Sequence, residues 1–167
     1  KPFRYHKVIL NQLAAEYVSL GTEETNRIHN ILCDWELAKQ RPELAFVHAI
    51  KAGNIAKLKE IITMYFLSFN PKIDVNIIRA FDLLPANTIE NDVTLLFFRA
   101  VIRIRKKETQ IASRRDFIAA TTLIENLLDE ANPMEALLYE VIIQMTYRIN
   151  GLWDQLINRL HLLEEML

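Results

Sequence analysis

The chain has 167 residues, a formal net charge of −1, 51% hydrophobic residues and 25% charged residues. This length suits one domain with a sizeable core, and the near-neutral charge gives no general attraction to nucleic acid or an anionic membrane. Only 3 glycines and 5 prolines occur among many Leu, Ile, Ala, Glu, Lys and Arg residues. The composition therefore predicts an all-α fold rather than a sheet with many turns.

Cysteine content and the apolar runs bear on the cellular compartment. Cys33 is the single cysteine, so an intramolecular disulfide is excluded and a reducing cytosol is favoured. The N-terminal KPFRYHK lacks the apolar core of a signal peptide. The most apolar run, 93–102, contains Arg99 and is much shorter than a membrane span. We expect a cytoplasmic protein without a membrane partner, cut from a longer chain because the sequence starts at Lys1 and stops within a helical pattern.

Hydrophobic periodicity predicts a series of helices along the whole chain. Residues 2–6 suggest a short strand or turn that leads into a helix ending near residue 20, and a second helix starts at Thr22 and carries Trp35. Further helices are expected at about 42–52, 54–68, 73–84, 91–107, 114–130, 133–150 and 152–167. The short connections between them are typical of antiparallel helix pairs.

The segment from Pro42 to Pro85 shows how two of these helices should meet. Gly53 suits a left-handed C-terminal cap because it has no Cβ, and Asn54 can cap the helix that follows. His48 lies among small residues, so a structural hydrogen bond is its expected role. The small residues that let the partner helix approach closely are Ala45, Ala49 and Ala52.

The second half of the chain contains an internal repeat of two helix pairs. A shift of 41 residues aligns the helix at 91–107 with the helix at 133–150, and a shift of 39 aligns the helices that follow them. A period near 40 residues predicts TPR-like antiparallel helix-pair repeats in a right-handed α-solenoid. Chance alignment of amphipathic helices is the alternative. The aligned positions are Val93 with Met134, Leu96 with Leu137, Phe97 with Leu138, Ala100 with Val141, Val101 with Ile142, and Ile104 with Met145.

The first helix of each repeated pair is apolar on two nearly opposite faces at 100° per residue. A helix with two apolar faces is either sandwiched or lines a groove. The groove interpretation predicts ligand or partner binding by the second face, and the alternative is packing between neighbouring repeats. The residues concerned are Phe98, Ile102, Tyr139, Ile143 and Tyr147.

A basic segment runs from Arg99 to Arg115 and contains seven cationic residues against Glu108 alone. Arg99 and Arg103 lie on one flank of their helix, together with Lys106, between its two apolar faces. An anion or acidic-partner site at the mouth of the groove is one interpretation, and a solvated face is the other. Few aromatic residues are interleaved with these charges, which disfavours binding of single-stranded nucleic acid.

The sequence contains little that suggests catalysis or metal binding. His29 and Cys33 are four residues apart on one helix face, as two metal ligands could be, but further ligands are not nearby in sequence, so helix packing is the favoured role. No glycine-rich phosphate loop, G-x-S-x-G motif or catalytic Cys–His pair occurs. We therefore expect a non-enzymatic chain without a metal or cofactor of its own.

The order of several motifs resembles one family of regulators. FRYH from Phe3, a helix carrying Ile28 and Trp35, PELAFVHAIKAGN, LLP and LLFFRA follow one another as in the MalT-like activators, the large ATP-dependent LuxR-type regulators. In that family a nucleotide-binding module precedes a winged helix, a TPR-like superhelix and a DNA-reading helix-turn-helix. The resemblance covers about residues 3–102. It implies that residues 1–20 end a winged-helix domain and that residues 21–167 form a helical-repeat sensor or interaction domain.

The sequence also departs from that family. The phosphate loop and the DNA-reading helix are absent from it, and KKET at 106–109 stands where such repeats usually carry a glycine. The resemblance therefore implies a sensor role without direct nucleic-acid contact. The partners would be a small-molecule inducer or regulatory protein, together with ATP-binding and DNA-binding domains outside this sequence.

Two other classes of protein fit parts of the pattern. One is a plain TPR-like protein–protein interaction scaffold without a small ligand. The other is the ligand-binding and dimerisation bundle of a one-component repressor, which the 41-residue repeat disfavours. The sequence stops at Leu167 on a repeat face that would normally meet a further repeat or a cap, so we expect the isolated chain to form a homodimer or to fray at that end.

Overall fold

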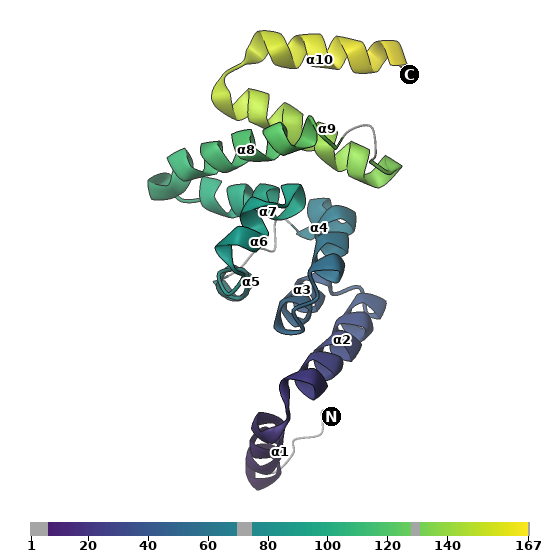
Figure 1. Ribbon diagram of the computed structural model, residues 1–167, viewed down its shortest axis with the longest axis vertical. Helices are drawn as coiled ribbons and strands as arrows, with labels where there is room; N and C mark the ends of the chain where they lie inside the picture. Colours follow the sequence, from purple (N-terminus) through teal and green to yellow (C-terminus); the bar gives the residue numbers. More distant parts are fainter. Residues whose placement is uncertain (1–6, 70–74, 128–130, 167) are drawn as a thin grey trace.

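The computed structural model describes residues 7–69, 75–127 and 131–166, and within these ranges every regular element is a helix. This confirms the all-α prediction. Figure 1 shows the helices following one another along an elongated molecule, with α1 at one end and α10 at the other. None of the described helices is both long and apolar enough to cross a membrane. The elements are α1 (Lys7–Ser19), α2 (Thr22–Ala38), α3 (Pro42–Lys51), α4 (Ile55–Phe69), α5 (Val75–Phe81), α6 (Ala86–Glu90), α7 (Val93–Ile104), the 3₁₀ turn η2 (Lys107–Thr109), α8 (Gln110–Ile124), α9 (Pro133–Asn150) and α10 (Trp153–Met166).

Most boundaries agree with the periodicity to within a few residues, and the differences have local causes. Helix α5 ends at Phe81, before the predicted residue 84, because Leu84 precedes a proline and is disfavoured in the α conformation. The short helix α6 after Pro85 was not predicted, and α8 begins at Gln110 rather than 114 because it follows η2 directly. The strand or turn predicted at 2–6 lies outside the described residues.

The turn between α3 and α4 has the predicted geometry. Gly53 has φ +64°, its N–H donates to Ile50 O at 2.9 Å, and the Asn54 N–H donates to Ala49 O at 3.0 Å. These bonds satisfy carbonyl groups that a helix end otherwise leaves unpaired. The Asn54 side-chain oxygen accepts from the Lys57 N–H at 3.0 Å, which confirms its capping role.

The core contains a cluster of aromatic rings where α3, α5 and α7 meet. The ring of Phe98 lies 4.9 Å from that of Phe46 and 5.2 Å from that of Phe81, between centroids. All three side chains are buried. The core continues between α7 and α8, where the rings of Phe97 and Phe117 are 6.0 Å apart.

Two stretches of sequentially packed helices meet at α4. On one side α2 packs on α3 and α3 on α4, and on the other side α7, α8, α9 and α10 pack in succession. Helix α4 contacts both α7 and α9. A long-range junction of this kind creates surface between segments that are far apart in sequence, and the candidate site lies there.

Candidate binding groove

The apolar residues predicted to line a groove lie mainly inside the protein. Phe98 has no exposed surface, and Ile102, Tyr139 and Ile143 are also buried, while Tyr147 packs against the core from its edge. This is the packing between helices that the sequence left open as an alternative. A ligand-binding role for these five residues stays a prediction.

The two arginines predicted at the groove mouth bind a carboxylate of the protein itself. Arg99 Nε and Nη2 donate to the two oxygens of Asp116 at 3.0 and 2.8 Å, and Arg103 Nη1 donates to Oδ2 at 2.7 Å. Asp116 is buried, with 5% of its surface exposed. Asp116 was not selected from the sequence, although a signal for it was present. In an antiparallel hairpin, residues equally far from the α7–α8 turn face each other, and this rule pairs Arg99 with Asp116.

His29 takes part in a hydrogen-bonded chain with Tyr17 and His48. Its Nδ1 lies 2.9 Å from Nδ1 of His48, and its Nε2 lies 2.7 Å from the Tyr17 hydroxyl. The structural hydrogen bond predicted for His48 is therefore present. Burial, followed by the nearby Asp34, raises the pKa of the Cys33 thiol. Among the described residues no three His, Cys, Asp or Glu side chains are placed to share a metal ion.

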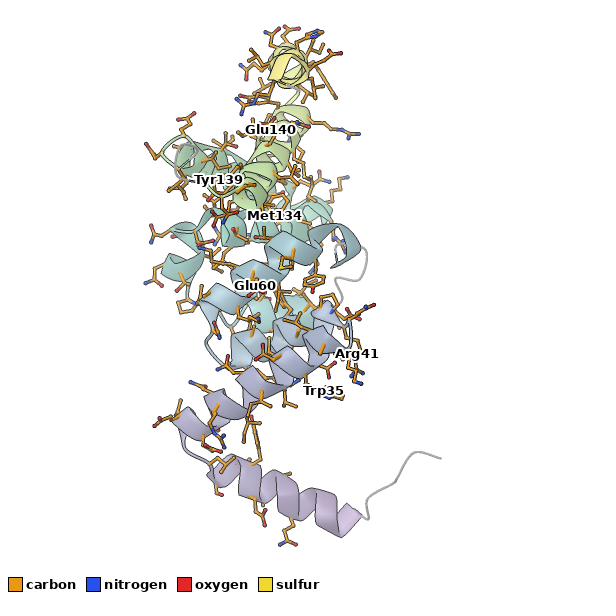
Figure 2. The ribbon with its side chains drawn as sticks, turned by 90° about the vertical axis from the view of Figure 1, so that its right-hand side faces the viewer. Trp35, Arg41, Glu60, Met134, Tyr139 and Glu140 are labelled. Atoms are coloured by element: carbon orange, nitrogen blue, oxygen red, sulfur yellow. The ribbon has the colours of Figure 1, made fainter. Side chains whose placement is uncertain are left out.

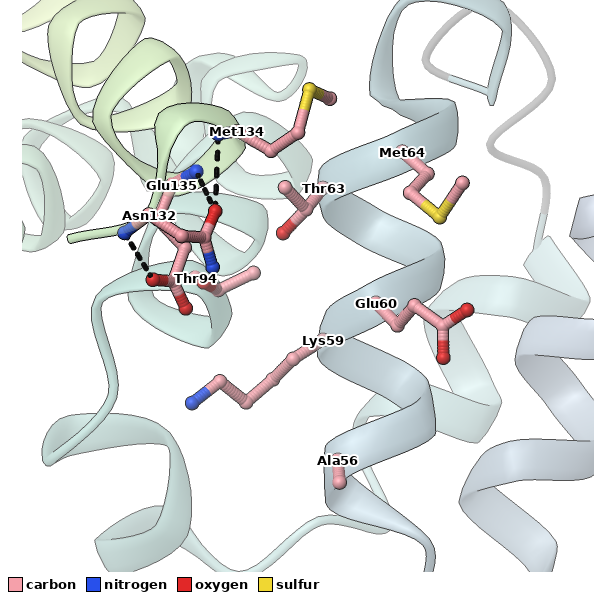
Figure 3. A pocket seen from close by; sticks show the side chains of 9 residues that line it. All are labelled: Ala56, Lys59, Glu60, Thr63, Met64, Thr94, Asn132, Met134 and Glu135. Carbon is pink, nitrogen blue, oxygen red and sulfur yellow. Dashed lines mark hydrogen bonds between the residues drawn. The ribbon is translucent and has the colours of Figure 1, made fainter.

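A cavity of about 450 Å³ lies between α4 and the N-terminal ends of α7 and α9, and we call it the α4–α9 groove. A smaller cavity of about 180 Å³ shares Lys59, Thr94 and Glu135 with it and extends it towards Asp92 and Tyr139. Figure 3 shows the lining side chains seen from close by. They are Ala56, Lys59, Glu60, Thr63, Met64, Thr94, Asn132, Met134 and Glu135.

We call Lys59, Asp92, Glu135 and Tyr139 the floor of the groove, and Lys59 is its cation. The Lys59 side chain reaches from α4 towards the starts of α7 and α9 (Figure 3), and Nζ lies 2.7 Å from Oδ2 of Asp92. Burial by itself would lower the pKa of Lys59, but the hydrogen bond and charge of Asp92 outweigh it, so the pKa is raised. Burial, followed by the charge of Glu135, raises the pKa of the Tyr139 phenol. The floor therefore holds an ammonium group and a neutral hydroxyl at neutral pH.

Both helix N-termini at the groove are already capped. Asp92 Oδ1 accepts from the Leu95 N–H at 3.0 Å, and Asn132 Oδ1 accepts from the N–H groups of Met134 and Glu135 at 3.0 Å each. Glu135 completes a capping box by accepting from the Asn132 N–H at 3.1 Å (Figure 3). Because these N–H groups are occupied, the helix ends offer an anion little. Three carboxylates line the two cavities: Asp92 pairs with Lys59, Glu135 belongs to the capping box, and Glu60 lies 3.3 Å from Lys57 Nζ.

Two methionines form an exposed lip above this floor. Met64 on α4 is 56% exposed and Met134 on α9 is 49% exposed. Figure 2 shows Met134 on the same side of the molecule as Glu60, with which it lines the groove. Methionine is unbranched and polarisable, so it adapts to ligands of different shape. A fixed polar floor under an adaptable apolar lip is an arrangement suited to binding.

Comparison of the chain with protein-family models, curated proteins and solved structures gives no match. The resemblance to LuxR-type regulators therefore stays a prediction. The groove residues were not selected from the sequence, because Lys59 and Met134 belong to separate helices whose contact no local pattern indicates.

Proposed function

We propose that this chain is a helical-repeat sensor and interaction module that binds a small inducer or a segment of a regulatory protein in the α4–α9 groove. Its work would be to relay occupancy to nucleotide-binding and DNA-binding domains outside this sequence, as the resemblance to MalT-like regulators implies. The observation that supports this proposal is the groove itself. It combines a hydrogen-bonded floor with a methionine lip at the junction of two helical stretches.

The charges of the groove define the kind of ligand it would accept. Among the residues that line the two cavities, the carboxylates of Glu60, Asp92 and Glu135 outnumber the ammonium of Lys59. Glu60 is also paired with Lys57 at 3.3 Å, and the remaining excess of negative charge favours a ligand that presents an ammonium, guanidinium or other donor group. Met64 and Met134 favour an apolar group beside that donor. A small amine with an apolar substituent and a peptide with a basic residue next to an apolar one both satisfy these requirements.

Coupling to other domains would follow from the position of α4. This helix packs on α3 and contacts both α7 and α9, so a ligand between α4 and α9 touches both helical stretches at once. A ligand shifts such an arrangement only by binding one spacing of the helices more tightly than another. In this proposal the groove would supply those differential contacts.

Methionine methyl NMR tests the proposal directly. The chain is labelled with ¹³C at the four methionine methyl groups and titrated separately with an amine-containing fragment library and with dodecapeptides selected by phage display. Binding in the groove should shift the Met64 and Met134 signals and leave Met145, which packs against the core, unchanged. Shifts confined to other methionines, or none with either probe, would refute groove binding.

Two alanine variants provide the matched control. Ala56 is exposed and lines the groove, so Ala56→Trp should fill it and abolish the shifts. Ala119 is exposed on α8, and Ala119→Trp should leave binding unchanged. The alternative function, a TPR-like protein–protein scaffold without a small ligand, predicts that peptides but no fragments give these shifts.

A further inference from the structure

Helix α10 is held firmly on α9 by one side only. Arg159 donates from Nε and Nη2 to Glu140 Oε2 at 3.0 and 2.8 Å, a forked contact with a carboxylate that is 14% exposed. Leu156, one turn away, is partly buried as well. This attachment fixes the rotation of α10 about its axis, and with it the face that α10 shows to solvent.

That solvent face carries a row of large apolar side chains. Trp153, Ile157 and Leu160 are 55%, 51% and 48% exposed, and at 100° per residue they lie within about 60° of arc. Glu164 follows on the same line. We call these four residues the α10 stripe. Three large exposed apolar residues on one helix line are typical of an interaction surface rather than of scattered surface residues.

The stripe can face an antiparallel copy of itself in register, as any helix line with residues at i, i+4, i+7 and i+11 can. Its successive spacings are four, three and four residues, so a second copy running antiparallel places Ile157 opposite the partner's Leu160 and Trp153 opposite the partner's Glu164. We propose that the α10 stripe binds a second copy of this chain in an antiparallel, two-fold symmetric pair. Each contact then occurs twice, as in an isologous interface.

The charges along α10 favour the antiparallel arrangement over a parallel one. In the antiparallel pair the Glu164 carboxylate lies beside the N-terminus of the partner's α10, where the helix dipole favours negative charge, and within reach of the Trp153 indole N–H donor. Asp154 and His161 share one flank of the helix, and the two-fold axis brings Asp154 towards the partner's His161. A parallel pair would instead place Glu164 beside the partner's Glu164.

The size of the stripe sets the expected affinity. A helix of 14 residues is about 21 Å long, and three apolar side chains on each copy cover less than the roughly 800 Å² per partner of a standard interface. We therefore expect a weak dimer with a dissociation constant of about 10–100 µM.

Sedimentation equilibrium of the 167-residue chain between 5 µM and 1 mM tests the pairing. Ile157→Asp places a charge at the centre of the stripe and should weaken association at least tenfold. Leu162→Asp is the matched control, because Leu162 is 56% exposed on the opposite side of the same helix, and it should leave association unchanged. A chain that stays monomeric at 1 mM, or that loses association equally in both variants, would overturn the proposal.

Cysteine cross-linking tests the direction of pairing. A Trp153→Cys chain mixed with a Glu164→Cys chain should give a mixed disulfide, with little product from Trp153→Cys alone. Cys33 is 1% exposed and stays out of the reaction. Self-coupling of Trp153→Cys as the main product would indicate parallel pairing and contradict the inference. His161→Lys should strengthen association and His161→Glu should weaken it, because each residue faces the partner's Asp154.

Discussion

Asp116 is expected to stabilise the α7–α8 pair through its buried ion pairs with Arg99 and Arg103. Its carboxylate is 7% exposed and accepts all three hydrogen bonds from Arg99 and Arg103, whose side chains are 15% and 34% exposed. Removing one partner of a buried ion pair costs about 3–5 kcal/mol. Arg103 reaches water readily and the exposed Glu90 lies 3.8 Å from Arg99, so Asp116→Ala should lower the free energy of unfolding by about 3 kcal/mol.

Urea unfolding followed by circular dichroism measures this loss. Arg103→Gln removes a single bond from a partly exposed side chain and should cost about 1 kcal/mol. Arg27→Gln, which breaks an exposed pair with Glu24, should cause no measurable change. An Asp116→Ala loss below about 1 kcal/mol, or an Arg103→Gln loss as large as that of Asp116→Ala, would refute the reasoning.

Three further predictions concern the core, a cap and pH. Phe98→Ala should lower the free energy of unfolding by about 3–5 kcal/mol in the same urea assay, because the ring is fully buried. Asn132→Ala should cost about 1 kcal/mol through loss of the α9 cap, whereas Asn158→Ala on an exposed face should change little. Burial lowers the pKa values of His29 and His48, so below about pH 6.5 the unfolded chain binds protons that the folded chain excludes. Stability should therefore fall between pH 7.5 and 5.5, and His48→Gln should reduce that fall; an equal fall in both proteins would contradict it.

Local features of the fold were readable because they depend on neighbours in sequence. The Gly53 turn needs only a residue that tolerates positive φ followed by a capping side chain, and both residues can be identified directly from the sequence. The end of α5 was less readable, because the preference against α conformation before Pro85 competes with a continuing apolar pattern. Helix α6 is only five residues long, which is too short for periodicity to show.

The candidate site was not readable because it depends on which helices touch. Periodicity correctly marked α7 and α9 as apolar on two faces, but it does not say whether a second face meets solvent or another helix. For Phe98 the neighbour is the aromatic cluster of α3 and α5. For Arg99 it is Asp116 on α8. Exposed Met64 and Met134 look like ordinary core residues in sequence, and only the contact of α4 with α9 brings them together.

The helix pairs whose sequences align at shifts of 41 and 39 residues show that equivalent positions can differ in burial. Val93 and Leu96 are 4% and 2% exposed because α7 packs against α4 and α6, while their counterparts Met134 and Leu137 are 49% and 60% exposed. The same apolar pattern that builds the core in one pair therefore forms the lip of the groove in the next. Ile118 on α8 and its counterpart Ile157 on α10 are both 51% exposed. Ile118 has the exposed polar residues Arg115 and Thr122 beside it on its helix line, whereas Ile157 has the exposed apolar residues Trp153 and Leu160. The two proposed binding surfaces lie where this apolar pattern is left uncovered. Substitutions at these exposed positions, rather than in the core, should therefore separate binding from folding.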